Sequence, residues 1–186
     1  RYIDGAAEAG CDCAKFQSYK AETIVSKDSP AYWDITKEPT KTQYELFQKY
    51  DSFNEAEFAE LCEYAHFKGM DFTATPFDYA SADYLERYVD FYKISSSDAS
   101  NLPFLEHVGS KGKPVVLSVG ASWLSEVDEA VRTLERSGCT DITILHCVLS
   151  YPTDPANANL RVIETLAQDF PRHKVGYSDH VAPDSA

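Results

Sequence analysis

The residues with the clearest chemical potential form one run, Tyr92-Lys93-Ile94-Ser95-Ser96-Ser97-Asp98. The run begins as a buried strand, carries a lysine inside it, and continues with three hydroxyls and a carboxylate. A lysine in a buried strand is costly unless an anion meets it. Because ligands of parallel α/β proteins bind at the carboxyl ends of the strands, the run predicts a site for an anionic small molecule. A lysine that reaches solvent from a strand end, or that pairs with a neighbouring carboxylate, is the plainer alternative.

Similar polar groups follow the other expected strands. They are Lys15, Gln17, Thr75, Asp78, Ser118, His146, Ser150, Tyr151, Ser178, Asp179 and His180. If the strands form one barrel, these side chains meet in one pocket at its carboxyl end. Two lysines with several serines suit a phosphate and a carboxylate, and a histidine beside them suits a divalent metal or acid–base chemistry.

The elements that must position these residues repeat in the order strand, polar exit, helix and glycine. Strands are expected at 11–17, 71–77, 91–95, 115–120, 142–147 and 174–180. Helices are expected at 2–9, 43–49, 55–68, 82–88, 102–110 and 159–168. A further amphipathic helix is expected to begin after Ser122 or Ser125 and to end at Glu135, with Leu124, Val127, Val131 and Leu134 on one face. The expected N-caps are Asn54, Ser81 and either Ser122 or Ser125. Residues 18–42 have no clear period and predict a long irregular loop of the kind that serves as a lid or a dimer contact.

This order, without a hairpin signal, indicates parallel β/α units. The 186 residues fall short of the roughly 250 that are typical of a TIM barrel. We therefore expect an α/β fold, a (β/α)8 TIM barrel fragment that lacks the first and last strands, with residues 1–186 as one partial catalytic domain. A doubly wound open sheet is the alternative, but that fold usually shows a Gly-rich phosphate loop, which is not visible here.

Composition narrows the class of partner. Hydrophobic residues make up 44% and charged residues 25%, which is ordinary for a globular domain. The net charge of −13 argues against nucleic-acid binding and against an anionic membrane surface. The five cysteines form no CxxC pair, so reduced thiols in a cytoplasmic protein are expected, with a Cys/His zinc site as a weaker alternative. No signal peptide or membrane-length apolar run is visible.

Seven motifs in order resemble the sialic acid synthase family. They are Lys15-Phe16-Gln17, Thr75-Pro76-Phe77-Asp78, Tyr92-Lys93-Ile94-Ser95-Ser96, Asn101-Leu102-Pro103, Gly112-Lys113-Pro114 with Leu117-Ser118, Leu145-His146-Cys147 with Ser150-Tyr151-Pro152-Thr153, and Gly176-Tyr177-Ser178-Asp179-His180. Any one of them alone is weak, whereas seven in order across nearly the whole chain are specific. Members of that family condense phosphoenolpyruvate with an N-acylated amino sugar aldehyde.

The resemblance implies a role for each site residue. Lys15, Lys93 and Asp98 would be catalytic. The substrate would be bound by Lys15, Gln17, Lys93, Ser96, Ser118, Tyr151 and Ser178. His180 would be one of two histidine ligands to a divalent metal, Mn²⁺ first, with Mg²⁺ or Co²⁺ possible. A homodimer is expected for the full-length protein.

Several features depart from the family pattern. The family's acidic first strand, its second metal histidine and its C-terminal antifreeze-like domain have no counterpart in this sequence, so we expect a fragment that does not catalyse alone. Leu149, Val119 and Ala121 replace the family's usual residues and bear on sugar specificity. The alternatives are a related enzyme acting on an aldose phosphate and a non-catalytic binding module. Asp98 as a helix cap, a buried structural His146, and solvated His66, His107 and His173 are further expectations.

Overall fold

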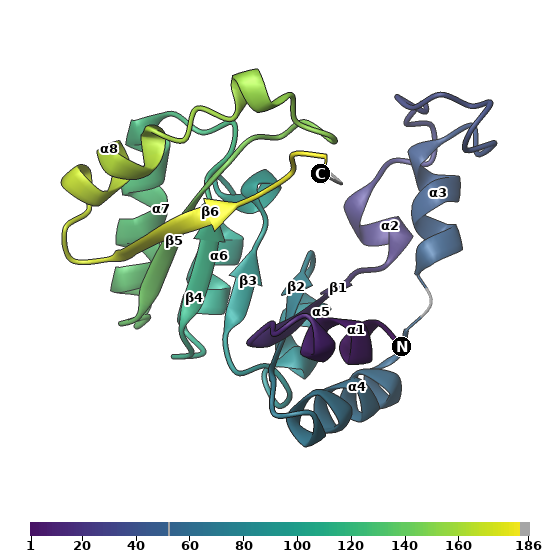
Figure 1. Ribbon diagram of the computed structural model, residues 1–186, viewed down its shortest axis with the longest axis horizontal. Coiled ribbons are helices and arrows are strands. Elements are labelled where there is room, and N and C mark those ends of the chain that lie inside the picture. The colour runs from purple at the N-terminus through teal and green to yellow at the C-terminus, as the bar shows by residue number, and fades with distance from the viewer. Residues whose placement is uncertain (52, 183–186) are drawn as a thin grey trace. The chain divides into compact units, whose positions relative to one another are not determined.

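The computed structural model describes residues 1–51 and 53–182 (Figure 1). The chain forms two compact units, Arg1–Val89 and Asp90–Ala186, and each is described by itself. In both units the strands pair in parallel, which confirms the predicted parallel α/β class. None of the helices in the described ranges combines the length and the hydrophobicity needed to cross a membrane.

The first unit is built around two strands, β1 (Cys13–Ser18) and β2 (Asp71–Pro76), whose register pairs Lys15 with Thr73 and Gln17 with Thr75. Its helices are α1 (Tyr2–Glu8), α2 (Ala21–Ile24), α3 (Gln43–Tyr50), α4 (Glu55–Phe67) and α5 (Tyr79–Leu85). The core forms where α4 packs against β2, with Phe58, Ala65 and Phe72 at most 1% exposed. The short helix α2 lies inside the stretch that was predicted to be irregular, so that prediction is wrong there.

Of the two helix caps predicted in this unit, one is confirmed and one is wrong. Asn54 caps α4 as predicted. Its side-chain oxygen accepts a hydrogen bond from the Glu57 N–H, and the Glu57 carboxylate accepts one from the Asn54 N–H. The prediction of Ser81 as a cap is wrong. Asp78 caps α5, and its carboxylate accepts the Ser81 N–H at 2.7 Å, so the helix begins earlier than expected.

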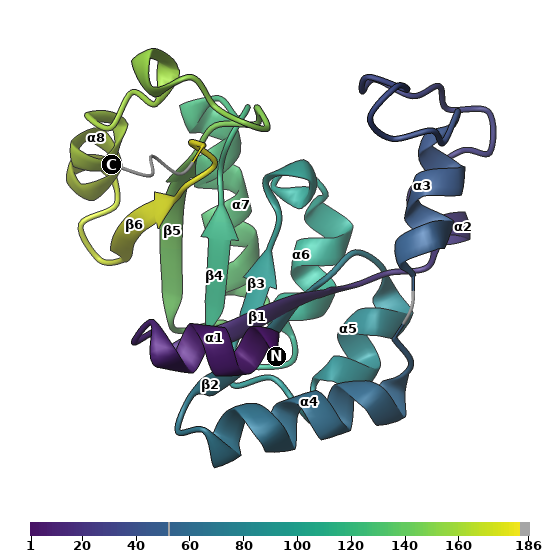
Figure 2. The ribbon, with the colours of Figure 1, turned by 45° about the vertical axis from the view of Figure 1, so that its right-hand side comes forward.

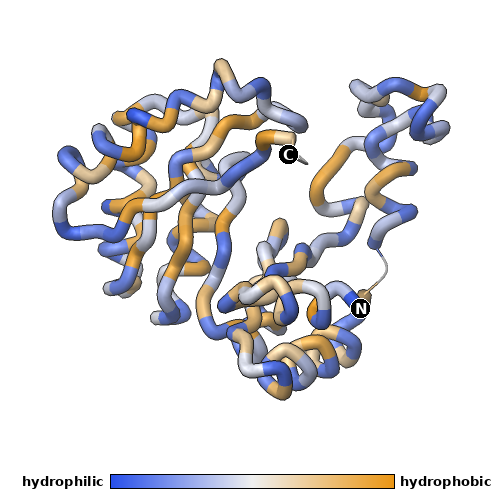
Figure 3. The backbone as a smooth tube through the Cα atoms, in the orientation of Figure 1, coloured by the Kyte–Doolittle hydropathy of each residue, from blue (hydrophilic) through white to orange (hydrophobic). Residues whose placement is uncertain are grey.

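The second unit is a four-stranded parallel sheet in the order β3-β4-β5-β6, with strands Tyr92–Ile94, Val115–Ser118, Ile142–Cys147 and Lys174–Ser178 (Figure 2). Its helices are α6 (Leu102–Gly109), α7 (Leu124–Arg136) and α8 (Val162–Asp169), with single 3₁₀ turns η1 (Ser96–Asp98) and η2 (Pro155–Asn157). Hydrophobic positions gather along β4 and β5 (Figure 3), and Leu105, Leu117, Leu134 and Ile144 are fully buried. This core fixes the carboxyl ends of four strands side by side.

Helix α7 begins differently from its prediction. Neither Ser122 nor Ser125 caps it; Trp123 is the N-cap residue, and the Glu126 carboxylate accepts the Trp123 N–H at 2.7 Å. The expected apolar face is otherwise correct, with Val127, Val131 and Leu134 buried, whereas Leu124 is 46% exposed.

Candidate active site

Lys93 lies on β3 with 7% of its surface exposed. Its ammonium donates to Ser118 Oγ at 2.6 Å and to the Ile94 carbonyl oxygen at 2.7 Å. The parallel register sets Ile94 beside Leu117, which brings Ser118 at the end of β4 next to the lysine. The ammonium is held inside the unit by these bonds, so the alternative of a lysine that extends to solvent is wrong.

Two buried serine hydroxyls frame this end of the sheet. Ser118 is 2% and Ser96 7% exposed. Ser118 Oγ accepts from Lys93, and Ser96 Oγ accepts the Gly120 N–H at 2.9 Å. In the part of the chain that the structure describes, neither hydroxyl has an acceptor for its own proton. A buried donor without an acceptor is costly, so these protons suit an anion placed beside them.

Gly120 makes this arrangement possible and was missed by sequence reasoning. A Cβ at this position would lie 3.0 Å from the Cys147 carbonyl oxygen and 3.1 Å from Ser96 Oγ. The backbone after β4 therefore passes so close to Ser96 and Cys147 that a side chain here would push these neighbours away by a few tenths of an ångström. The Ser-Val-Gly spacing after a strand is the one sequence signal that could have pointed to it.

His180 follows β6 and is oriented by the loop after β5. Its Nδ1 lies 2.8 Å from the Val148 carbonyl oxygen, and because a carbonyl only accepts, Nδ1 carries the proton. The lone pair of the neutral imidazole is then on Nε2. Cys147 Sγ is 3.6 Å from Nδ1, and the Tyr151 ring packs on the imidazole with centroids 4.1 Å apart.

This orientation fits a metal ligand, since metal-binding histidines usually donate their other N–H to a carbonyl or carboxylate. Within the described ranges no group of three or more His, Cys, Asp or Glu side chains could hold a metal ion. A metal centre that includes His180 would therefore need ligands that are not part of a cluster of these side chains in the described ranges.

Asp98 lies in η1 and is half-buried. Burial raises the pKa of its carboxyl group, while hydrogen bonds from Asn101 and Ser97 act in the opposite direction. The alternative reading of Asp98 as a cap is wrong, because Asn101 is the N-cap residue of α6 and no side chain caps that helix. Ser178, half-buried at the end of β6, pairs in register with Cys147.

Lys15 and Gln17 belong to the first unit, where they project from the same face of β1 and are both exposed. Desolvation by surrounding protein atoms lowers the pKa of the Lys15 ammonium, although contact with solvent limits the effect. Their convergence with Lys93 stays a prediction, because each unit is described by itself.

His146 is buried and hydrogen-bonded, as predicted. It is 6% exposed, its Nε2 donates to the Ala158 carbonyl oxygen at 2.7 Å, and its ring stacks on Tyr177. The prediction of a solvated His173 is wrong, since its side chain is 10% exposed and lies 3.3 Å from Glu135.

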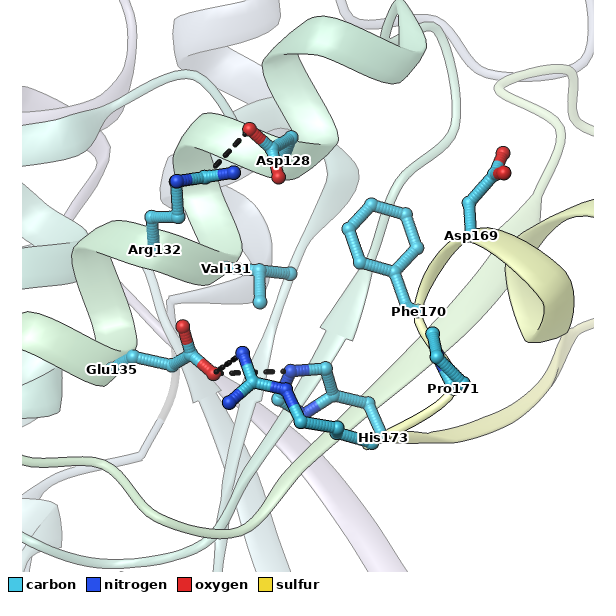
Figure 4. Close-up of a pocket in the computed structure, with 9 residues that line it drawn as sticks. Asp128, Val131, Arg132, Glu135, Asp169, Phe170, Pro171 and His173 are labelled. Carbon is cyan, nitrogen blue, oxygen red and sulfur yellow. Dashed lines mark hydrogen bonds and ion pairs between the residues drawn. The ribbon is translucent and has the colours of Figure 1, made fainter.

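His173 lines a cavity of about 210 Å³ between α7 and the turn before β6 (Figure 4). The cavity is lined by Asp128, Val131, Arg132, Glu135, Asp169, Phe170, Pro171, Arg172 and His173. Arg132 pairs with Asp128, and Arg172 and His173 both contact Glu135. None of the predicted site residues lines it, and its ion pairs fasten the turn before β6 to α7.

Comparison with known proteins identifies the family. The sequence matches the NeuB family over residues 2–185. An uncharacterized protein of Methanocaldococcus jannaschii is 44% identical over 96% of this chain and 49% of its own length. N-acetylneuraminate-9-phosphate synthase of Drosophila melanogaster is 33% identical over 94% of this chain and 47% of its own length.

A solved structure is also similar. N-acetylneuraminic acid synthetase from Leptospira borgpetersenii serovar Hardjo-bovis, in complex with citrate, matches with a TM-score of 0.84 at 34% identity. The match covers 97% of this chain and 59% of that one. The chain spans about half the length of the curated relatives it matches. By the family match over nearly its whole length, the chain belongs to the NeuB family.

Proposed function

We propose that the protein condenses phosphoenolpyruvate with an N-acylated amino sugar aldehyde, N-acetylmannosamine or a related hexosamine. The products are a sialic acid-type nonulosonic acid and phosphate. Family membership and the names of the relatives support this sugar acid chemistry. The structural observation that carries the proposal is the buried Lys93 ammonium on Ser118 Oγ, together with the buried Ser118 and Ser96 hydroxyl protons that have no acceptor in the described part of the chain.

Each substrate group has a proposed partner. Lys93, Ser118 and Ser96 bind the phosphate or the carboxylate of phosphoenolpyruvate through charge-assisted and hydroxyl hydrogen bonds. A complete (β/α)8 barrel is part of the proposal, because it would bring Lys15, Gln17, Tyr151 and Ser178 to the same pocket. The homodimer and the cytoplasmic location are also part of it.

In this reaction the protein contributes by positioning the two substrates and stabilising charge, without forming a covalent bond to either of them. The alkene carbon of phosphoenolpyruvate attacks the aldehyde carbon, water adds to the cationic carbon that results, and phosphate leaves by cleavage of its C–O bond. Lys15 and Lys93 balance the charge of the reacting anion. Asp98 lies near the reacting carbons in this proposal, and its raised pKa suits it to hold or pass a proton there.

A divalent metal, Mn²⁺ first with Mg²⁺ or Co²⁺ as alternatives, would be held by His180 and would supply Lewis acidity at the aldehyde oxygen of the sugar. The Nδ1–H bond to Val148 supports this role, since it leaves Nε2 to bind.

The test is phosphate release from phosphoenolpyruvate by the full-length protein, with Mn²⁺, against a panel of N-acylated hexosamines. In ¹⁸O-labelled water the label should enter the sugar acid and be absent from the phosphate, because the C–O bond breaks. Phosphoenolpyruvate binding without phosphate release for any acceptor would refute the proposal and favour the binding module.

A phosphorylated acceptor is the second candidate. The Drosophila relative is named for a 9-phosphate product, whereas the Leptospira structure is named for the unphosphorylated acid. The panel therefore includes N-acetylmannosamine 6-phosphate. We expect a preference for the unphosphorylated sugar, because a second phosphate would call for further basic residues, and few follow the strands.

A further inference from the structure

The loop after β5 closes over His180 through one buried threonine. Thr153 is 2% exposed. Its backbone N–H donates to the His180 carbonyl oxygen at 2.8 Å, and its hydroxyl donates to the Ser150 carbonyl oxygen at 2.9 Å. Thr153 therefore ties the loop both to the chain after β6 and to itself. The neighbouring bridge between Thr153 and Val181 continues the connection.

The same loop provides both groups that fix the His180 ring. Val148 supplies the carbonyl oxygen that accepts the Nδ1 proton, and Tyr151 supplies the ring that packs on the imidazole. The bond from the Thr153 hydroxyl to Ser150 closes the turn that carries Tyr151, directly after Val148. If that bond is lost, the carbonyl and the aromatic ring lose the support that holds them against the histidine.

We propose that Thr153 is a positioning residue for His180, acting through the loop at residues 148–153 to keep the proton on Nδ1 and the lone pair on Nε2. The inference rests on the proposed function in one respect, which is the role of His180 as a metal ligand. Partners that orient metal-binding histidines are typically worth 10–100-fold in metal affinity. Thr153 does not contact the imidazole, so its effect passes through Val148 and Tyr151.

The test compares Thr153→Val with Thr153→Ser in the full-length protein. Valine keeps the shape and removes the hydroxyl, whereas serine keeps the hydroxyl and removes the methyl group. Thr165→Val is the matched control, because Thr165 is exposed on α8 in the same unit. Mn²⁺ affinity is measured by titration of the free-ion electron paramagnetic resonance signal at one fixed pH. The His180 tautomer is read from ¹⁵N chemical shifts of the metal-free protein.

We expect Thr153→Val to weaken Mn²⁺ binding about 10-fold or more and to mix the two tautomers of His180. Thr153→Ser and Thr165→Val should stay within about twofold and keep the Nδ1–H tautomer. Wild-type affinity together with an unchanged tautomer in Thr153→Val would overturn the inference. If the valine variant does not fold, a changed tautomer in Thr153→Ser overturns it instead, since that variant retains the hydroxyl.

His180→Ala separates this inference from the proposed function. If His180→Ala leaves Mn²⁺ binding unchanged, the metal role of His180 fails. The ¹⁵N measurement on metal-free Thr153→Val still decides whether Thr153 positions the imidazole.

Discussion

Replacing Lys93 with methionine separates the cost of burying an ammonium from its use in binding. Methionine has a similar length and no charge, so it fills the space on β3. Two hydrogen bonds, to Ser118 at 2.6 Å and to Ile94 at 2.7 Å, are lost. Each is worth about 1.5–3 kcal/mol because the donor is charged.

The loss is offset by relief of desolvation, which costs several kcal/mol for a buried ion. We therefore expect the free energy of unfolding to change by no more than about 2 kcal/mol, or about 4–8 °C in Tm. Binding should respond far more strongly. When a buried anion loses its charged partner, its binding free energy becomes less favourable by about 3–5 kcal/mol. For phosphoenolpyruvate this corresponds to roughly a 100- to 4,000-fold rise in Kd.

The assay is isothermal titration calorimetry of phosphoenolpyruvate with the full-length protein, alongside thermal unfolding without ligand. Lys174→Met is the matched control, because Lys174 lies at the start of β6 and its side chain is 73% exposed in an ion pair with Asp141. That pair is worth about 1 kcal/mol or less, and the affinity should not change. If Lys93→Met binds within threefold of wild type and loses stability by more than about 3 kcal/mol, Lys93 is a structural lysine and the anion site is refuted.

Three further predictions concern other parts of the chain. Gly120→Ala should weaken phosphoenolpyruvate binding about 10-fold or more in calorimetry, because its Cβ would meet the Cys147 carbonyl oxygen at 3.0 Å and Ser96 Oγ at 3.1 Å; unchanged affinity would contradict the packing argument. Burial raises the pKa of Asp98, so the folded protein retains that proton to higher pH than the unfolded chain, and stability falls as the pH rises through the folded pKa. Asp98→Asn should therefore raise Tm at pH 7, with a gain that shrinks as the pH falls through the folded pKa and is absent below about 3.9; a gain independent of pH would count against it. Asn54→Ala should cost about 1 kcal/mol, or about 2–4 °C in thermal unfolding, because the capping bonds at the start of α4 are lost, whereas Asn54→Asp should stay close to wild type.

The sequence predicted the strands and most of the helices well, because their signals are local. The alternation of polar exits and glycines marks each β/α unit, and Asn54 with Glu57 makes a cap within one helical turn. The predicted caps, Ser81 and either Ser122 or Ser125, were wrong because local sequence does not single out one cap residue. Several residues near each helix start could accept a free N–H group, and the folded backbone presents the Ser81 N–H to Asp78 and the Trp123 N–H to Glu126.

In the candidate site, too, the sequence indicated the residue types and the structure was needed for their contacts. The residue types that suit an anion, Lys93 and Ser118, were visible in the sequence, and so was His180 as a histidine beside them. Their contacts were not, because the lysine and its serine are 25 residues apart and meet only through the register of β3 with β4.

What the sequence by itself determined is the parallel α/β class, the order of its units and the chemical types at the strand ends. Hydrophobic period, turn residues and side-chain type are properties of short segments, so they can be read without coordinates. Only the tertiary structure decided which hydroxyl lies beside the buried ammonium, which carbonyl accepts the His180 proton, and how close the Gly120 backbone lies to Ser96 and Cys147. These contacts join segments far apart in the chain, and their geometry depends on strand register and close packing, which no local pattern encodes.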